Sequence, residues 1–251
     1  MRNVWTIARR ELRLYFISPI AYIIGLLILL VTGIYFTLIV YLSSRSAYTY
    51  GYATPPGIDG ILGVMVFLFL LSLPALTMRL MADEHRAGTL ELLLTSPIKD
   101  YELVFGKWLG AFVFILMVIA ITMIYPIVLN SLVTNGIDQG TVASSYLALI
   151  LVAATFLSIG TAISSFFNNQ FAAFFATIVV LFFFWWVIGW PAAIMQQAAG
   201  SEIFTYLSMS SHFYDSMMVG KITLGDIVYY LSLTGLGLFL GTVAVEIRRW
   251  Q

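Results

Sequence analysis

Long stretches without a charged side chain constrain this chain more than any other feature. The clearest covers residues 20–42, a run of 23 residues, and a helix of about 20 residues is long enough to cross a hydrocarbon core about 30 Å thick. Charged residues make up 10% of the chain and hydrophobic residues 61%, whereas a soluble domain carries roughly 25% charged residues. We therefore predict an integral membrane protein.

Six such stretches predict an all-α membrane protein with six transmembrane helices in a single domain, residues 1–251. The fourth and fifth helices share one uncharged stretch, which we divide at Asn168, Asn169 and Gln170 because three successive amides are costly at bilayer depth. Pro191 ends the fifth helix. The predicted spans are residues 20–42, 60–78, 108–129, 142–165, 171–190 and 227–245.

The positions of Lys and Arg predict that both termini are cytoplasmic. With the N-terminus inside, ten of the twelve basic residues fall in inner segments, and only Arg45 and Lys221 fall in outer ones. Loops on the cytoplasmic side of a membrane are enriched in these two residue types. The sequence therefore predicts a multi-pass protein of a cytoplasmic membrane, in contact with the lipid bilayer.

Two segments outside the spans have a defined character. Residues 1–19 predict an amphipathic helix on the membrane surface, although Glu11 lies near the edge of its apolar face. Residues 191–226 form the longest external segment, too apolar for a solvated loop, and we expect partial burial against the bundle as re-entrant helices. The apolar face of the first segment consists of Val4, Trp5, Ala8, Leu12, Tyr15 and Phe16.

A cytoplasmic segment, residues 82–104, concentrates charged residues between two apolar blocks. Gly88 and Thr89 supply a break and a helix N-cap, and Glu91 is well placed against the helix dipole. Leucines follow, and Pro97 ends the helix after about two turns. Because so short a helix is marginal alone, it packs either on the rim of its own bundle or into a soluble partner.

The residues of this segment resemble a known pattern. The arrangement Glu84-x-Arg86-x-Gly88-Thr89-x-Glu91-Leu92-Leu93-x-x-x-Pro97, followed by Gly106-Lys107, resembles the signature after the second span of ABC-2 type permeases, the membrane subunits of bacterial ABC exporters. The stretch from SSHFYDSMMVGKITLGDIVYYLSL to EIRRW is similar to permeases of gliding motility and of nitrous-oxide-reductase maturation. The resemblance covers the whole chain.

The resemblance implies a multi-subunit transporter in a bacterial cytoplasmic (inner) membrane. Two permeases, either two copies or this chain and a paralogue, form a dimer, and each docks on a cytosolic ATP-binding cassette subunit. ATP and Mg are bound by that ATPase, so this chain has no cofactor of its own. The helix near Thr89 is then the coupling helix. The residues that couple it to the ATPase are Asp83, Glu84, Arg86, Gly88, Thr89, Glu91 and Leu92.

Missing motifs favour a non-enzymatic chain. No G-x-x-x-x-G-K-[ST] phosphate loop occurs, there is no Cys, and His85 and His212 are far apart in the sequence. We therefore assign no catalytic residue and no metal site. A net charge of zero predicts no nucleic-acid partner. The absence of an ionisable residue in the middle of a span disfavours an ion-coupled carrier.

Small and aromatic residues suggest further roles in two of the spans. Gly237 and Gly241 form a G-x-x-x-G pattern, which indicates close helix packing or, as the alternative, a hinge. Phe183 and Trp186 lie in the aromatic run LFFFWWVIGW. This run belongs either to a lipid-facing aromatic belt or to a dimer interface or hydrophobic substrate path.

The external segment also contains a grouping that could suggest a hydrolase. His212 lies near Ser210, Ser211 and Asp215. No G-x-S-x-G motif accompanies them, so we expect His212 to be a polar residue that caps a re-entrant helix.

Together these features predict the permease subunit of an ABC exporter that moves an apolar or amphipathic substrate, driven by ATP hydrolysis on another subunit. Two other functions stay open. One is a non-transporting membrane subunit of an ATPase-driven assembly or mechanical complex, and the other is an intramembrane enzyme. The sequence does not identify the substrate, and it does not separate a homodimer from a heterodimer.

Overall fold

The computed structural model describes residues 2–50, 57–82, 99–133, 136–195 and 200–249. Helices make up most of this part of the chain, and no strand occurs within it. Six helical stretches are long and apolar enough to cross a membrane, namely Pro19–Arg45, Asp59–Thr77, Asp100–Leu132, Gln139–Phe166, Gln170–Ile194 and Leu224–Ile247. The prediction of an all-α protein with six such helices is therefore confirmed.

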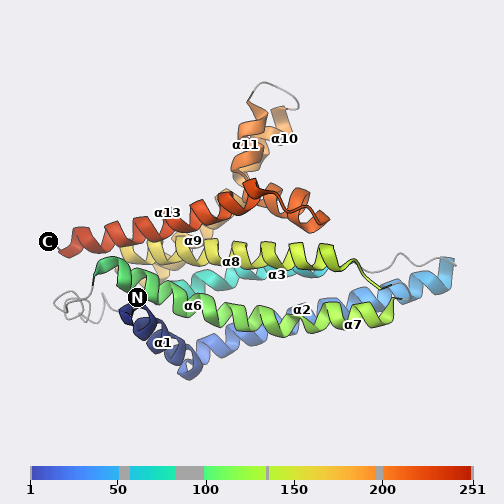
Figure 1. Cartoon of the computed structure of the whole chain (residues 1–251), viewed down its shortest axis with the longest axis horizontal. Helices are drawn as coiled ribbons and strands as arrows, with labels where there is room; N and C mark the ends of the chain where they lie inside the picture. Colours follow the sequence, from blue (N-terminus) through green and yellow to red (C-terminus); the bar gives the residue numbers. More distant parts are fainter. Residues whose placement is uncertain (1, 51–56, 83–98, 134–135, 196–199, 250–251) are drawn as a thin grey trace.

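The chain begins with a helix that folds back against the bundle. Helix α1 (Arg2–Ile17) turns at Ser18 into the long helix α2 (Pro19–Tyr50), and α3 (Asp59–Thr77) follows. Pro19 suits the first position of a helix, where the backbone N–H that proline lacks would have no partner. Figure 1 shows α1 set at an angle to α2, with the N-terminus and C-terminus at the same end of the bundle.

The middle of the chain continues with long helices. Helices α6 (Asp100–Thr122) and α7 (Ile124–Leu132) form one membrane-length stretch, and α8 (Gln139–Phe166) and α9 (Gln170–Trp185) follow. Asn169 caps α9 by accepting from the N–H groups of Phe171 and Ala172. The predicted division of the fourth and fifth spans therefore lies between the end of α8 and the N-cap of α9, which Asn169 supplies.

Short elements precede the last span. They are η1 (Val187–Gly189), α10 (Trp190–Met195), α11 (Ser201–Leu207), α12 (Met209–Ser211), η2 (His212–Ser216) and η3 (Met217–Val219), followed by the long α13 (Leu224–Arg249). Helices α10 and α11 stand out steeply from the side of the bundle (Figure 1). The elements after them fold inward, because Met209, Phe213 and Met217 are fully buried.

Helix α8 is the centre of the bundle and the most buried of the six stretches. It packs against α3, α6, α9 and α13. Hydroxyl groups along it bond to backbone carbonyls, as Thr155 does to Leu151 and Thr161 does to Leu157. Such bonds satisfy polar groups where no water is available, so a serine- and threonine-rich helix can lie in the core.

Several boundaries and one buried face differ from the sequence-based expectation, and α9, for example, ends at Trp185 and not at Pro191. Helix α6 begins at Asp100 and not at residue 108, because Glu102 in its first turn accepts from the backbone N–H of Lys99 at the N-cap. The buried face of α1 contains Ile7, Ala8 and Glu11, while Trp5 of the expected apolar face is 62% exposed. The rotation follows from the buried partner of Glu11, described below.

Glycines on α13 allow its close approach to α8. A Cβ on Gly237 would lie 2.9 Å from the backbone carbon of Ser158, and a Cβ on Gly241 would lie 3.4 Å from the Cα of Ala162. Gly235, on the same helix, has no atom within 4 Å of such a position. Two of the three glycines therefore face a neighbouring helix within this chain.

Alanine at Gly237 should destabilise the protein, whereas alanine at Gly235 should not. Gly237→Ala forces α13 away from α8, and overpacking of this kind costs about 1–3 kcal/mol. Gly235→Ala is the matched control, since the same change there only improves helix propensity, by about 1 kcal/mol. Thermal unfolding of both variants in detergent compares them. Equal melting temperatures would contradict the packing role of Gly237.

Candidate functional site

The residues expected to couple this chain to an ATPase fall in residues 83–98, outside the described part of the chain. They are Asp83, Glu84, Arg86, Gly88, Thr89, Glu91 and Leu92. The structure does describe the two points at which this segment joins the bundle. We call these points the α3 anchor, residues 78–82, and the α6 anchor, residues 99–107.

The α3 anchor is tied to the central helix by one hydroxyl group. Ser164 of α8 accepts from the backbone N–H groups of Met81 and Ala82, at 3.2 Å each, and donates to the carbonyl of Met78 at 3.2 Å. These backbone groups lie beyond the end of α3 at Thr77. Because they are buried, they require hydrogen-bond partners from another element. The chain is therefore held on α8 up to the start of residues 83–98.

The α6 anchor is tied to the N-terminal helix. Glu102 accepts from Asn3 of α1, with 3.0 Å between Nδ2 and Oε2, and from the backbone N–H of Lys99 at 3.2 Å. Both bonds reach the same carboxylate oxygen, so α1, Lys99 and the first turn of α6 meet at one atom.

A buried lysine joins the two anchors to each other. The Lys107 side chain is 2% exposed, and its Nζ lies 3.1 Å from Oε1 of Glu11, whose side chain is 8% exposed. Nζ also donates to the carbonyl of Leu80 at 2.6 Å. Removing a charge from water is expensive unless it is paired and hydrogen-bonded. The ammonium therefore fixes α1, the α3 anchor and α6 in one arrangement.

Close packing makes α1 and α6 act as one piece. A Cβ on Gly106 would lie 2.8 Å from Cβ of Ile7, and one on Gly110 would lie 2.9 Å from the carbonyl oxygen of Ala8. Burial, reinforced by Glu11, raises the pKa of the nearby Tyr15 hydroxyl, which is therefore neutral. The junction contains two carboxylates and one buried ammonium in fixed bonds, whereas the buried hydroxyl of Tyr15 has no hydrogen-bond partner within the described residues.

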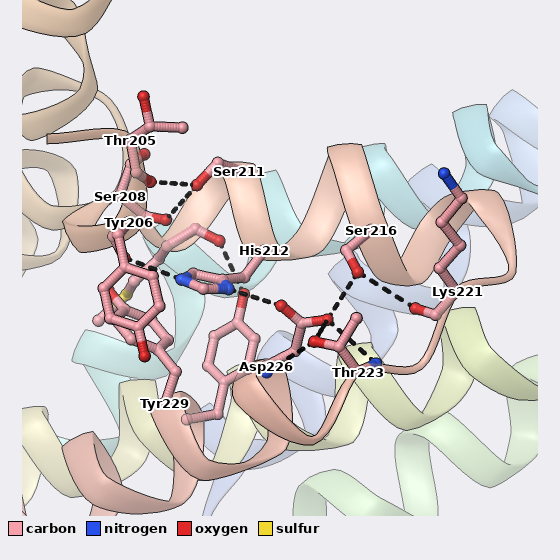
Figure 2. A network of polar contacts seen from close by, with 12 residues as sticks. Thr205, Tyr206, Ser208, Ser211, His212, Ser216, Lys221, Thr223, Asp226 and Tyr229 are labelled. Atoms are coloured by element: carbon pink, nitrogen blue, oxygen red, sulfur yellow. Dashed lines mark hydrogen bonds and ion pairs between the residues drawn. The ribbon is translucent and has the colours of Figure 1, made fainter. Parts of the chain in front are cut away.

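A second polar cluster lies between η2 and the start of α13 (Figure 2). His212 and Asp226 are 8% and 4% exposed, and Nδ1 of the histidine lies 2.6 Å from Oδ1 of the aspartate. The other carboxylate oxygen accepts from Ser216 at 2.6 Å and from the hydroxyl of Thr223 at 2.7 Å. We call these four residues the histidine cluster.

Both ring nitrogens of His212 face an acceptor. Nε2 lies 2.8 Å from the carbonyl oxygen of Tyr206, and a carbonyl can only accept, so Nε2 carries a hydrogen. Nδ1 lies against the Asp226 carboxylate, and the two groups form an ion pair when both ring nitrogens carry a hydrogen. Tyr229 stacks on this ring, with 4.1 Å between the centroids.

This geometry does not support a serine hydrolase. Ser211 donates to the carbonyls of Thr205 and Ser208, at 2.5 and 2.8 Å, and His212 already uses both nitrogens. The partner of the histidine is Asp226 in the first turn of α13, and sequence reasoning missed it. The only available signal was an acidic residue immediately before a predicted span.

The two aromatic residues considered for a substrate path lie in different surroundings. Phe183 is 46% exposed on the surface of the chain. Trp186 packs against Phe182, with ring centroids 4.7 Å apart, and against Phe67 of α3 at 6.3 Å. Within the chain the structure does not bring the two side chains together. No group of three metal-binding side chains occurs within the described residues.

Comparison with known proteins identifies one family. A family model described as ABC-2 family transporter protein matches residues 5–245. A search of curated proteins finds no match to the chain.

The variant Lys107→Met should destabilise the end of the bundle at which both chain termini lie. Lys107→Met leaves the buried Glu11 carboxylate with the half-exposed Arg10 as its remaining ionic partner, and breaking a buried pair costs at most about 3–5 kcal/mol. The double variant Glu11→Leu, Lys107→Met should recover much of that loss, because no buried charge is left over. Arg13→Met, an exposed change on the same helix, is the control. Denaturant unfolding in mixed micelles measures the difference, and equal stability of Lys107→Met and Arg13→Met would contradict the pairing.

Asparagine at Asp226 should loosen the segment between α10 and α13. Asp226→Asn removes the charge that the histidine ring and two hydroxyl groups contact, and hydrogen bonds to charged groups contribute about 1.5–3 kcal/mol. Hydrogen exchange of residues 201–223 should therefore speed up by at least roughly tenfold. Asp215→Asn is the matched control, since that carboxylate is exposed and is not one of the four residues of the histidine cluster. Unchanged exchange in Asp226→Asn would refute the proposed role.

Proposed function

The chain belongs to the ABC-2 transporter family, and we propose that it is the permease subunit of an ATP-binding cassette exporter in a bacterial cytoplasmic membrane. The observation that carries this proposal is the family match over residues 5–245, together with six membrane-length helices. ATP is hydrolysed by a separate cytosolic subunit, and this chain supplies the path through the membrane.

The two anchors support a mechanical route from that ATPase to the bundle. Residues 83–98 connect the α3 anchor to the α6 anchor in the sequence. Ser164 ties the first anchor to α8, and Lys107 ties it to α1 and α6. A push on residues 83–98 then reaches four helices at once, which favours movement of these helices as a rigid group.

We assign roles within residues 83–98 on the same basis. Gly88 allows the tight turn before the coupling helix, Thr89 caps it, and Glu91 favours its first turn. Leu92 supplies an apolar contact to the ATPase, and Glu84 supplies a charged one. The functional unit is a dimer of this chain with a second copy or a paralogue, and the exported substrate is apolar or amphipathic.

Alanine at Glu84 or proline at Gly88 should impair transport while the protein still inserts. Both changes act on the contact with the ATPase and leave the six spans unaltered. The assay is ATP-dependent export of a labelled amphiphile from liposomes that contain this chain and its cassette ATPase, with Glu246→Gln in α13 as a control that should export normally. Insertion is checked by membrane extraction and gel filtration.

Each outcome of this assay has a distinct meaning. Normal export by both variants would remove the coupling assignment. Stimulated ATP hydrolysis without export by the unaltered protein, for every amphiphile tried, would favour a non-transporting mechanical subunit. Turnover of a substrate by the purified chain without an ATPase would favour an enzyme.

A further inference from the structure

Two adjoining hollows lie at the base of the α10–α11 arm, beside the histidine cluster. Their volumes are about 430 and 380 Å³, within the range of roughly 300–1,000 Å³ typical of small-molecule sites. Thr205, Ser211 and Asp215 line both hollows. The proposed coupling to an ATPase depends on the two anchors beside residues 83–98. It assigns no role to either hollow.

The larger hollow is lined by aromatic rings. Trp186, Trp190 and Tyr214 contribute to its wall, and Trp190 and Tyr214 are 59% and 40% exposed. The face of an aromatic ring carries negative charge density and attracts cations, most strongly for Trp. Hydroxyl groups of Ser208, Ser210 and Ser211 complete the wall, and they can accept hydrogen bonds.

The smaller hollow adds negative charge. Glu202, Asp215 and Asp226 line it, but Asp226 is already paired with His212. Within the described chain, Glu202 and Asp215 form no ion pair, and no Lys or Arg lines either hollow. Lys221 bonds to Ser216 through its backbone N–H and carbonyl groups, and its side chain runs away from Asp226 (Figure 2).

The combination selects one kind of ligand. Two uncompensated carboxylates favour a positive charge, and the aromatic rings favour a cation that is weakly hydrated and carries carbon atoms. A bare metal ion is disfavoured, because within the described residues no three metal-binding side chains converge. Anions are disfavoured by the carboxylates and by the negative ring faces alike.

We propose that these hollows bind an organic ammonium group. Its charge faces Asp215 and Glu202, and its methyl or methylene groups lie against Trp186 and Trp190. The hollows adjoin the end of the membrane-length stretch Gln170–Ile194, so the ammonium is supplied either by the headgroup of a zwitterionic phospholipid or by a free amine. Binding requires only this chain, and the inference therefore does not depend on the partner ATPase.

Calorimetric titration of the full-length chain tests this proposal. The protein is placed in nanodiscs made of phosphatidylglycerol, and the probes are choline and dihexanoyl-phosphatidylethanolamine, with dihexanoyl-phosphatidylglycerol as the probe without an ammonium group and empty nanodiscs as the blank. Saturable binding of either ammonium probe, weaker at higher ionic strength, is the expected result. Binding of choline identifies a site for free amines, and binding of the phosphatidylethanolamine alone identifies a lipid site.

Variants distinguish the hollows from the rest of the surface. The double variant Asp215→Asn, Glu202→Gln should weaken binding by roughly fivefold, as expected for exposed charge pairs, and Trp190→Leu should weaken it by a similar factor. Asp59→Asn removes an exposed carboxylate outside both hollows and should bind normally. The proposal is overturned if neither ammonium probe binds, if the phosphatidylglycerol probe binds as tightly, or if the variants bind as the unaltered chain does.

Discussion

The buried ammonium group of Lys107 is the interaction on which the terminal end of the bundle depends. It contacts a carboxylate of α1 and a backbone carbonyl that follows α3, while its own backbone belongs to α6. A charge so deeply buried is costly unless it is paired and hydrogen-bonded. The pairing accords with the rotation of α1, which turns Glu11 inward and Trp5 outward, and it joins the two anchors that flank residues 83–98.

Between its two ends the bundle is held by close packing and short hydrogen bonds. Helix α8 packs against four other long helices. Several of its hydroxyl groups donate to carbonyls, as Thr155 does to Leu151 and Tyr230, although the buried hydroxyl of Ser145 has no such partner within the described residues. In a membrane the lipid is as apolar as a leucine side chain, so association depends on close contact rather than on hydrophobic burial. The approach of Gly237 to Ser158 is one such contact.

The opposite side of the molecule has a different chemistry. There the histidine cluster joins the segment after α10 to the start of α13, and it does so with charges that are paired. The hollows beside it keep two carboxylates without an ion-pair partner within the described chain. Both parts of the molecule thus use buried polar pairs to hold elements together, while the second also presents carboxylates that a ligand can use.

The sequence by itself determined the architecture of the membrane part, because uncharged stretches of about 20 residues have few stable alternatives in lipid. Asn168, Asn169 and Gln170 divided the fourth and fifth spans correctly, because three successive amide side chains are costly at bilayer depth. The signature around Gly88 indicated the family, which the match over residues 5–245 confirms. Only the tertiary structure decided that Glu11 meets Lys107 and that His212 meets Asp226. Pairs of this kind join helices whose relative rotation is set by packing, and no periodicity along a single helix contains that information.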